Sequence, residues 1–152
     1  MERLKLFFCY YEKYRNEYNA ILSMLKRKGY PCDNNSLIGG DSENEKDPAD
    51  EDARLQIGAK IANSDELILF IDDDTHNLPW IDWEIERAEE NYKLIVGIMK
   101  DINCKLPKAL DKLYHGGYNL LKRACWCNED EIVEAIKGEG PPFIAPRIQR
   151  LD

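Results

Sequence analysis

Three largely continuous apolar runs restrict the folds open to this chain more than any other feature. They read LKLFFCYY at residues 4–11, ELILFID at residues 66–72 and KLIVGIM at residues 93–99. A strand with one solvated face alternates apolar and polar residues, whereas a strand buried on both faces stays apolar throughout. The runs therefore predict the strands of a parallel sheet with helices on both of its faces.

Helical patterns lie between these runs. Apolar residues recur at helical spacing from residue 14 to residue 25, and bases and a glycine at residues 26–29 end that helix. A second helix is predicted to begin at DPAD, with Asp47 as its N-cap and Pro48 at its first position. The polar segment between the two helices has room for one short strand at residues 36–38.

The pattern is weaker after residue 99. It predicts a short helix at residues 107–113 and a last strand at either residues 118–121 or residues 124–126. Asn128 is expected to cap a final helix at residues 129–137.

This alternation of strands and helices predicts an open α/β sheet in one domain. We place the domain at residues 1–138 and expect residues 139–152, which contain three prolines, to form an extended or mobile C-terminal tail. Ligands of such sheets bind beyond the carboxyl ends of the strands. Function is therefore expected just after residue 10, in the loop at residues 39–50 and just after residue 71.

The charge and hydropathy of the chain exclude two classes of partner. The formal net charge is -8 and the chain has no basic stripe, so neither nucleic acid nor an anionic membrane is an expected partner. No apolar run approaches the roughly 20 residues that span a bilayer, and the start of the chain lacks the pattern of a signal peptide. We therefore expect a cytoplasmic protein.

The five cysteines are consistent with that location. Only Cys125 and Cys127 are close in sequence, in CWC, which is not the CxxC spacing of redox or zinc sites. The two histidines, His76 and His115, offer little help to a zinc ion. Reduced, buried cysteines are therefore favoured over a zinc site.

The loops contain few other patterns that indicate chemistry. Gly39 and Gly40 stand without a GxGxxG or P-loop pattern and favour a turn. The acids of IDDDT, residues 71–75, suit magnesium, but acids at a strand end are more often solvated residues or helix caps. Neither histidine is accompanied by a nucleophile-elbow serine. No metal is expected.

The segment PWIDWEIERAEE, residues 79–90, has five acids on a predicted helix. Glu84 falls about 40° from Trp80 around that helix, inside an apolar arc, when each residue advances by about 100°. It either reaches water at the margin of the arc or is a partly buried functional carboxylate. The other four acids fall together on a solvated face: Asp82, Glu86, Glu89 and Glu90.

Three segments together resemble a bacterial TIR-like domain: LKLFFCYY, ANSDELILFIDDDT and PWIDWEIERAEENYKLIVGI. The resemblance is to the TIR proteins of Thoeris anti-phage defence, the ThsB family, and extends over residues 4–137. Its most specific part is Trp80 followed by Glu84, within a W-x-x-[YW]-E-I run. It implies a flavodoxin-like fold, with a five-stranded parallel sheet in the order 2-1-3-4-5 and helices on both faces.

The resemblance also implies an activity. Enzymatic members cleave NAD at the nicotinamide–ribose bond, and the ThsB type makes a signal nucleotide of the cyclic ADP-ribose type. NAD would be the substrate, without a cofactor or metal, and Glu84 the catalytic residue. One carboxylate suffices because nicotinamide leaves without protonation and the oxocarbenium-like ribose needs electrostatic stabilisation. The implied partners are an effector protein that the signal activates, a phage-derived trigger and further TIR domains through self-association.

The resemblance assigns substrate binding to residues near the strand ends and the helix: Phe8, Cys9, Tyr10, Tyr11, Arg15, Thr75, His76 and Trp80. Cys9 stands where family members usually have serine, and Trp80 would shape the nicotinamide–ribose pocket. Arg15 either meets a pyrophosphate or is a surface arginine. Residues 41–51 occupy the place of the family's BB loop, which contacts neighbouring subunits and gates the site.

Two other interpretations of the chain stay open. In one it is a non-catalytic TIR-like sensor or interaction module, with Glu84 in an interface. In the other it resembles nucleoside deoxyribosyltransferases, whose similar fold also places a glutamate at a ribose. Release of nicotinamide from NAD distinguishes an NAD-cleaving TIR enzyme from these two alternatives.

Overall fold

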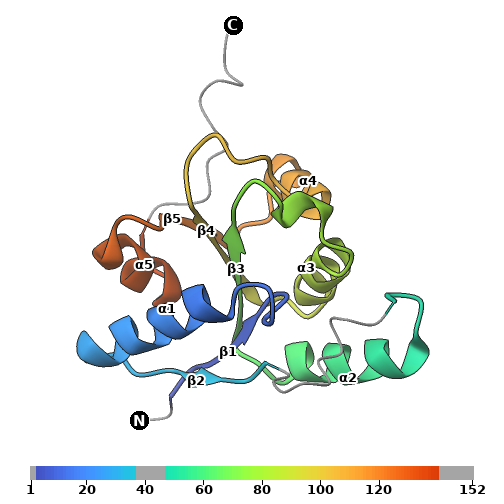
Figure 1. Ribbon diagram of the computed structural model, residues 1–152, viewed down its shortest axis with the longest axis horizontal. Helices are drawn as coiled ribbons and strands as arrows, with labels where there is room; N and C mark the ends of the chain where they lie inside the picture. Colours follow the sequence, from blue (N-terminus) through green and yellow to red (C-terminus); the bar gives the residue numbers. More distant parts are fainter. Residues whose placement is uncertain (1–2, 37–46, 141–152) are drawn as a thin grey trace, which may run out of the picture.

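The chain folds around one parallel β-sheet in the computed structural model, which describes residues 3–36 and 47–140. The sheet has five strands in the order β2-β1-β3-β4-β5, and every neighbouring pair is parallel (Figure 1). This confirms the predicted sheet and its strand order. The strands are β1 (Lys5–Phe8), β2 (Asp33–Asn34), β3 (Glu66–Ile71), β4 (Leu94–Met99) and β5 (Leu121–Cys125).

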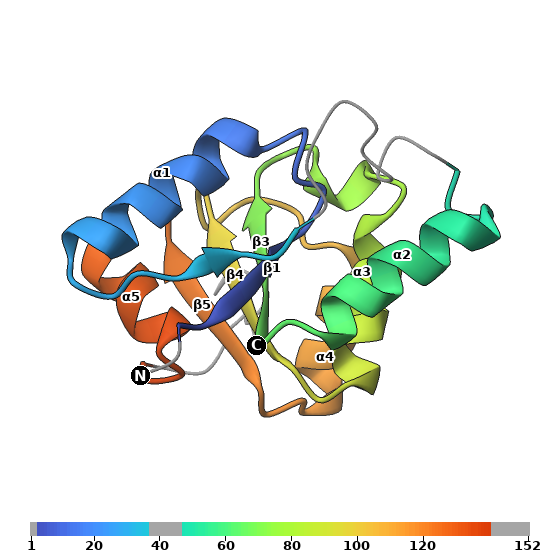
Figure 2. The same ribbon diagram turned by 90° about the horizontal axis from the view of Figure 1, so that it is seen from below.

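Helices cover both faces of the sheet, as Figures 1 and 2 show. Helices α1 and α5 lie on one face, and α2, α3 and α4 lie on the other. A short 3₁₀ helix, η2, joins β3 to α3. The helical segments are α1 (Arg15–Arg27), α2 (Glu51–Ala62), η2 (Thr75–Asn77), α3 (Ile81–Glu90), α4 (Lys108–Gly116) and α5 (Glu129–Ile136).

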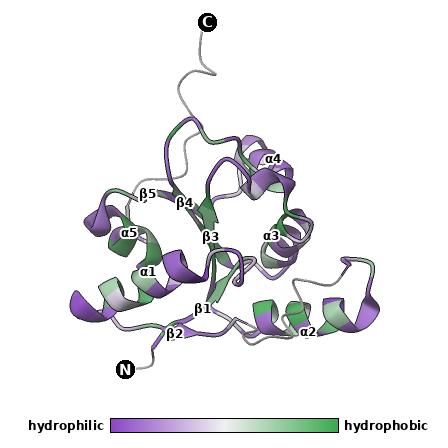
Figure 3. Ribbon diagram, viewed as in Figure 1, coloured by the Kyte–Doolittle hydropathy of each residue, from purple (hydrophilic) through white to green (hydrophobic). Residues whose placement is uncertain are grey.

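The sheet divides the core into two apolar layers. All six residues of β3 are buried, as expected for a strand covered on both faces. Successive residues of β1 and the residue after it alternate between the layers: Phe7 and Cys9 pack with α2, α3 and α4, whereas Leu6 and Phe8 pack with α1 and α5. Figure 3 shows the hydrophobic sheet at the centre and hydrophilic residues on the outer sides of the helices.

Helix α2 begins three residues later than the sequence predicts. Asp47 is not its N-cap, because residues 47–50 first form a turn in which the Asp47 carbonyl accepts from the Asp50 N–H at 2.9 Å. Asp50 is the cap instead, and its carboxylate accepts from the Ala53 N–H at 3.0 Å. At α5 the predicted cap is confirmed, since the Asn128 side chain accepts from the Glu131 N–H at 3.1 Å.

Strand β2 also differs from its prediction. It lies at Asp33–Asn34, earlier than residues 36–38, because Ser36 has already left the ladder and its hydroxyl accepts from the Phe8 N–H at 2.7 Å. Residues 37 and 38 lie outside the described residues, as do most of the loop at residues 39–50 and nearly all of the tail at residues 139–152. Strand β5 spans the gap between the two predicted positions, and α4 extends beyond its predicted end to Gly116.

The cysteines correct a further prediction. Cys125 and Cys127 form a disulfide rather than two thiols, because their single-residue separation brings the Cα atoms to 5.2 Å, within the range for such a bond. The other three cysteines are free and buried, as predicted: Cys9, Cys32 and Cys104. None of the helices in the described residues is long and apolar enough to cross a membrane.

Candidate functional site

The carboxyl ends of β1 and β3 form the topological switch point of the sheet, where the strand order reverses. The chain leaves β1 through α1 on one face and enters β3 from α2 on the other, which is where ligands of open α/β sheets bind. The last direct bond between the two strands runs from the Cys9 N–H to the Ile68 carbonyl at 2.9 Å. Beyond it the Tyr18 hydroxyl joins them, donating to the Cys9 carbonyl at 2.8 Å and accepting from the Phe70 N–H at 3.0 Å.

Glu84 lies in the first turn of α3, next to the carboxyl end of β1. Its N–H donates to the Trp80 carbonyl at 2.9 Å, so the two residues stand one helical turn apart. Both side chains are 0% exposed. Of the two sequence-based alternatives for Glu84, the buried carboxylate is therefore the observed one.

Cys9, the residue directly after β1, is a polar neighbour of Glu84. Burial raises the pKa of the Cys9 thiol, and the charge of Glu84 and a side-chain hydrogen bond between the two groups raise it further. Cys9 is therefore a neutral thiol at neutral pH and shares a hydrogen bond with the Glu84 side chain. Burial is the main cause of the raised pKa of Tyr18, and Glu84 contributes a smaller part. These contacts place the Glu84 side chain where direct hydrogen bonding between β1 and β3 ends.

Aromatic residues enclose the same corner. Trp80 contacts Trp83 edge to face, with ring centroids 5.3 Å apart, and Trp83 reaches across to Gly58 of α2. Tyr10 is half-buried against the same apolar layer, where the chain turns with a positive φ of 50°. Such a backbone conformation is uncommon for a residue other than glycine and is found disproportionately at functional sites.

The loop after β3 is held by hydrogen bonds to α1. The Tyr14 hydroxyl lies 2.7 Å from the Thr75 hydroxyl and 2.9 Å from the Asp72 carboxylate. Burial favours a raised pKa for Asp72, but hydrogen bonds from the Asp74 N–H and the Tyr14 and Thr75 hydroxyls outweigh it and lower the pKa. The first acid of IDDDT therefore braces the loop. Within residues 3–36 and 47–140, no group of three or more His, Cys, Asp or Glu side chains is arranged to hold a metal ion.

The structure separates the expected site residues into two groups. Cys9, Tyr10, Trp80 and Glu84 come together on the face of α2 and α3. On the opposite face, Phe8 stacks on Tyr18 at 4.6 Å, Tyr11 donates to Asn19 at 2.9 Å, and Thr75 bonds to Tyr14.

Two further expected residues lie nearer the surface. Arg15 is exposed, forms an ion pair with Glu12 and lies over the Tyr11 ring at 5.4 Å, so it occupies the surface position that was one of its two alternatives. His76 is half-buried in η2, and its Nδ1 has no hydrogen-bond partner among the described residues.

The roles of two side chains, Tyr18 at this corner and Asp82 on α3, were not foreseen from the sequence. Tyr18 was predicted only as an apolar residue of α1, and its role as a bridge depends on the split between the strands. Asp82 was assigned to the solvated face, but it is half-buried and accepts from the Ala109 N–H at 2.8 Å. Pro107, at the start of α4, supplies no side-chain cap. The other three acids of that face are exposed as predicted: Glu86, Glu89 and Glu90.

Comparison with known families decides the classification of the chain. The family model described as "Thoeris protein ThsB, TIR-like domain" matches residues 7–104, which is more than half of the 152 residues. The chain belongs to this family. Its matched ThsB range includes both sides of the corner, Cys9 and Tyr10 directly after β1 and Trp80 and Glu84 at α3. No match to the sequence is found among curated proteins.

Solved structures agree with a TIR-type fold for this ThsB family member. The CMP N-glycosidase BcmB of Clostridium botulinum superposes with a TM-score of 0.54 at 14% identity, over 88% of this chain and 98% of that one. The TIR domain heterodimer of RPS4 and RRS1 gives a TM-score of 0.52 at 16% identity, over 89% of this chain and 93% of that chain. At these identities the likeness concerns the fold.

Proposed function

We propose that the chain is an NAD-cleaving TIR enzyme of Thoeris-type anti-phage defence. It breaks the nicotinamide–ribose bond and makes a signal nucleotide of the cyclic ADP-ribose type, which activates a separate effector protein. The single observation that supports this most is Glu84, a buried carboxylate at the switch point between β1 and β3, bonded to Cys9 and one turn from Trp80. A cytoplasmic location, a phage-derived trigger and self-association through TIR domains belong to the same proposal.

The Glu84 carboxylate supplies the electrostatic stabilisation that this reaction needs. The nicotinamide of NAD is a cation and departs as a neutral base, so the bond breaks without a proton donor. Positive charge then develops on the ribose, and a fixed carboxylate in a water-poor site stabilises it strongly. Attack of another group of the same ADP-ribosyl unit on the anomeric carbon closes a ring, provided that water is excluded.

The neighbours of Glu84 have supporting roles in this proposal. Cys9 fixes the orientation of the carboxylate through its hydrogen bond, and Trp80 forms an apolar wall for the nicotinamide–ribose unit. Tyr10 and His76 border the substrate, and Arg15 binds its diphosphate once the ion pair with Glu12 opens. Phe8, Tyr11 and Thr75 support the site from the α1 face of the sheet and do not line it. Because Glu84 is 0% exposed, NAD must displace neighbouring side chains to reach it.

The test is release of nicotinamide from NAD, followed by chromatography of the nucleotide products. Glu84→Gln keeps the size of the side chain and removes its charge, so we expect a loss of activity of at least about 100-fold. The matched control is Glu86→Gln, an exposed acid on the same helix, which should retain wild-type activity. The assay is run at several protein concentrations and with extract of phage-infected cells, because a sensor can be silent until it is triggered.

Two results would contradict the proposal. If wild type releases nicotinamide no faster than Glu84→Gln under every condition, the non-catalytic sensor is the better assignment. If CMP is hydrolysed and NAD is not, the chain is a nucleotide N-glycosidase. We favour NAD because cytosine, unlike nicotinamide, leaves as an anion unless a nearby acid protonates it, and the thiol of Cys9 is a weak acid with a raised pKa.

A further inference from the structure

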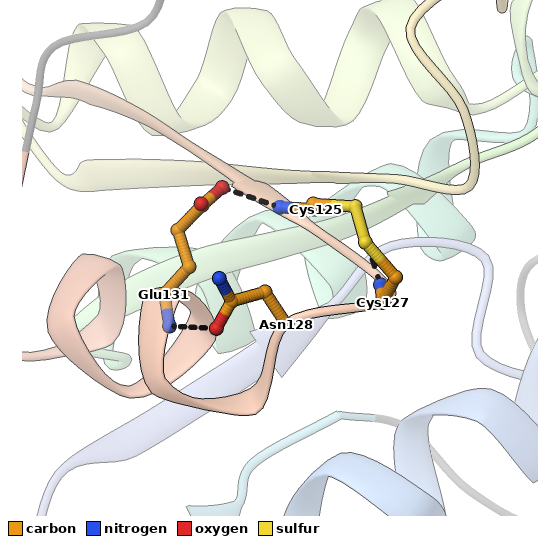
Figure 4. Close-up of a disulfide and its surroundings, with 4 residues drawn as sticks. All are labelled: Cys125, Cys127, Asn128 and Glu131. Carbon is orange, nitrogen blue, oxygen red and sulfur yellow. Dashed lines mark hydrogen bonds between the residues drawn. A yellow bond between two sulfur atoms is a disulfide. The ribbon is translucent and has the colours of Figure 1, made fainter.

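A disulfide marks the carboxyl end of β5, away from the corner that holds Glu84. Figure 4 shows Cys125 at the end of the strand and Cys127 next to Asn128, the cap of α5. The two cysteines are separated only by Trp126, and their Cα atoms are 5.2 Å apart. Cys127 is exposed and Cys125 is half-buried.

The bond contributes little to holding the fold. A disulfide stabilises mainly by closing a loop in the unfolded chain, and its effect is smallest for the shortest loops. Hydrogen bonds from backbone N–H groups already fix this segment. The Cys125 N–H donates to the Glu131 carboxylate at 2.8 Å, the Trp126 N–H to the Met99 carbonyl at 2.9 Å, and the Asn128 N–H to the Cys125 carbonyl at 3.0 Å. The same fold therefore accommodates both the disulfide and the two thiols.

A groove lies beside the exposed residue Cys127. It lies between α1 and α5, has a volume of about 700 Å³ and includes Trp126 and Cys127 in its wall. Its apolar lining comes from Ala20, Ile21, Met24 and Ile132. The ammonium group of Lys28, also in the wall, is already paired with Asp130 at 3.0 Å. A small thiol can therefore approach Cys127 without displacing the core.

We propose that Cys125 and Cys127 form a reversible dithiol–disulfide couple that exchanges with low-molecular-weight thiols at Cys127. Exposed disulfides are the labile ones in proteins, whereas buried structural bonds resist reduction. The other three cysteines are unsuited to exchange, since all are buried and burial raises the pKa of each thiol: Cys9, Cys32 and Cys104.

The exchange balances in two steps. A thiolate RS⁻ attacks the sulfur of Cys127, which forms an RS–Cys127 bond, breaks the bond to Cys125 and releases Cys125 as a thiolate that takes a proton from water. A second thiolate attacks the RS sulfur, forms RSSR and releases Cys127 as a thiolate, which is protonated in turn. Two thiols are oxidised to one RSSR while the protein disulfide is reduced to two thiols. Excess RSSR drives the reverse reaction.

The test uses the full folded chain in glutathione buffers of increasing oxidised fraction. Samples are quenched with acid, unfolded, alkylated and weighed by mass spectrometry. The expected result is a change of two alkylated thiols between the reduced and oxidised buffers, mapped by peptide analysis to Cys125 and Cys127. The matched control, Cys104→Ser, removes one buried thiol and should leave this change intact.

Two serine variants test which sulfur exchanges. Cys125→Ser should accumulate a glutathione adduct on the exposed Cys127, and Cys127→Ser should form an adduct on Cys125 more slowly. Circular dichroism checks that both variants fold. Wild type that stays dithiol in excess oxidised glutathione, or stays oxidised in excess reduced glutathione unless urea is added, would overturn the couple. A stable glutathione adduct on wild-type Cys127, or equal labelling of the two variants, would also overturn it. None of these results depends on cleavage of NAD.

Discussion

At the scale of single residues, two buried acids lie at opposite ends of the strands. Glu84 meets the carboxyl end of β1, whereas Glu66 is the first residue of β3 and is 5% exposed. Both acids stand among apolar residues in the sequence, so hydrophobic periodicity does not separate a functional one from a structural one. The two acids differ in their position in the sheet, and Glu84 lies at the carboxyl ends of the strands, where open α/β folds bind ligands.

Glu66 makes the stability of the fold depend on pH. Burial first, and then the charge of Asp65, raises the pKa of Glu66 from 4.5 to about 9. The unfolded chain releases this proton above about pH 4.5 while the folded chain retains it, so Glu66 lowers stability progressively as the pH rises toward 9. The slope for one proton is at most about 1.4 kcal/mol per pH unit.

Glu66→Gln should therefore stabilise the fold more at pH 8 than at pH 5. Urea unfolding of wild type and variant at both pH values measures this difference, and the comparison cancels the groups that both proteins share. Glu89→Gln, an exposed acid, should change stability equally little at the two pH values. The same stability difference at pH 5 and pH 8 for Glu66→Gln would show that Glu66 ionises normally in the folded protein.

At the scale of helices and strands, the sequence predicts the elements better than their ends. Long apolar runs identify β1, β3 and β4 because a doubly covered strand must be apolar throughout. The start of α2 was misplaced because Asp47 and Asp50 have the same capping chemistry and only the folded turn distinguishes them. The short β2 has two residues and no apolar run, so periodicity could not locate it.

The junction of β1, β3 and α1 depends on one hydroxyl. Tyr18→Phe removes the group that bonds the Cys9 carbonyl and the Phe70 N–H, leaving two buried backbone groups without that partner. Each such group costs about 1–3 kcal/mol, so we expect a loss of about 2–6 kcal/mol in the free energy of unfolding. Urea denaturation followed by circular dichroism measures it.

The matched control for this substitution is Tyr11→Phe on the same face. The Tyr11 hydroxyl bonds only the exposed Asn19 side chain among the described hydrogen bonds, so its removal should cost no more than about 1.5 kcal/mol. If the two variants are destabilised equally, the bridge between the strands is not what Tyr18 contributes.

At the scale of the whole molecule, the fold and the chemistry are separable. The open sheet was predicted from the residues, its strand order from the family resemblance, and a buried Glu84 as one of two alternatives. The division of the other expected site residues between two faces was not, because it depends on which way each β1 side chain points. A CMP N-glycosidase and a TIR domain pair share this fold at 14% and 16% identity, so the substrate must be tested rather than taken from the architecture.

The net charge of the molecule gives a test of the substrate that is independent of any one residue. The chain has a formal charge of -8, and NAD is an anion, so long-range repulsion should slow their encounter. Salt screens this repulsion over about 10 Å at 0.1 M. We therefore expect kcat/KM for NAD to rise between about 20 and 200 mM sodium chloride, a range in which the screening length falls from about 20 to about 7 Å.

Nicotinamide riboside is the matched control substrate, because it has the same scissile bond and cationic leaving group but no phosphate. Its net positive charge should be attracted to the acidic surface, so added salt should lower kcat/KM for the riboside while raising it for NAD. Initial rates of nicotinamide release from both substrates across the salt series measure the two slopes. Slopes of the same sign would mean that salt acts on the fold or on Glu84 rather than on substrate approach, and the net charge would then have no part in substrate selection.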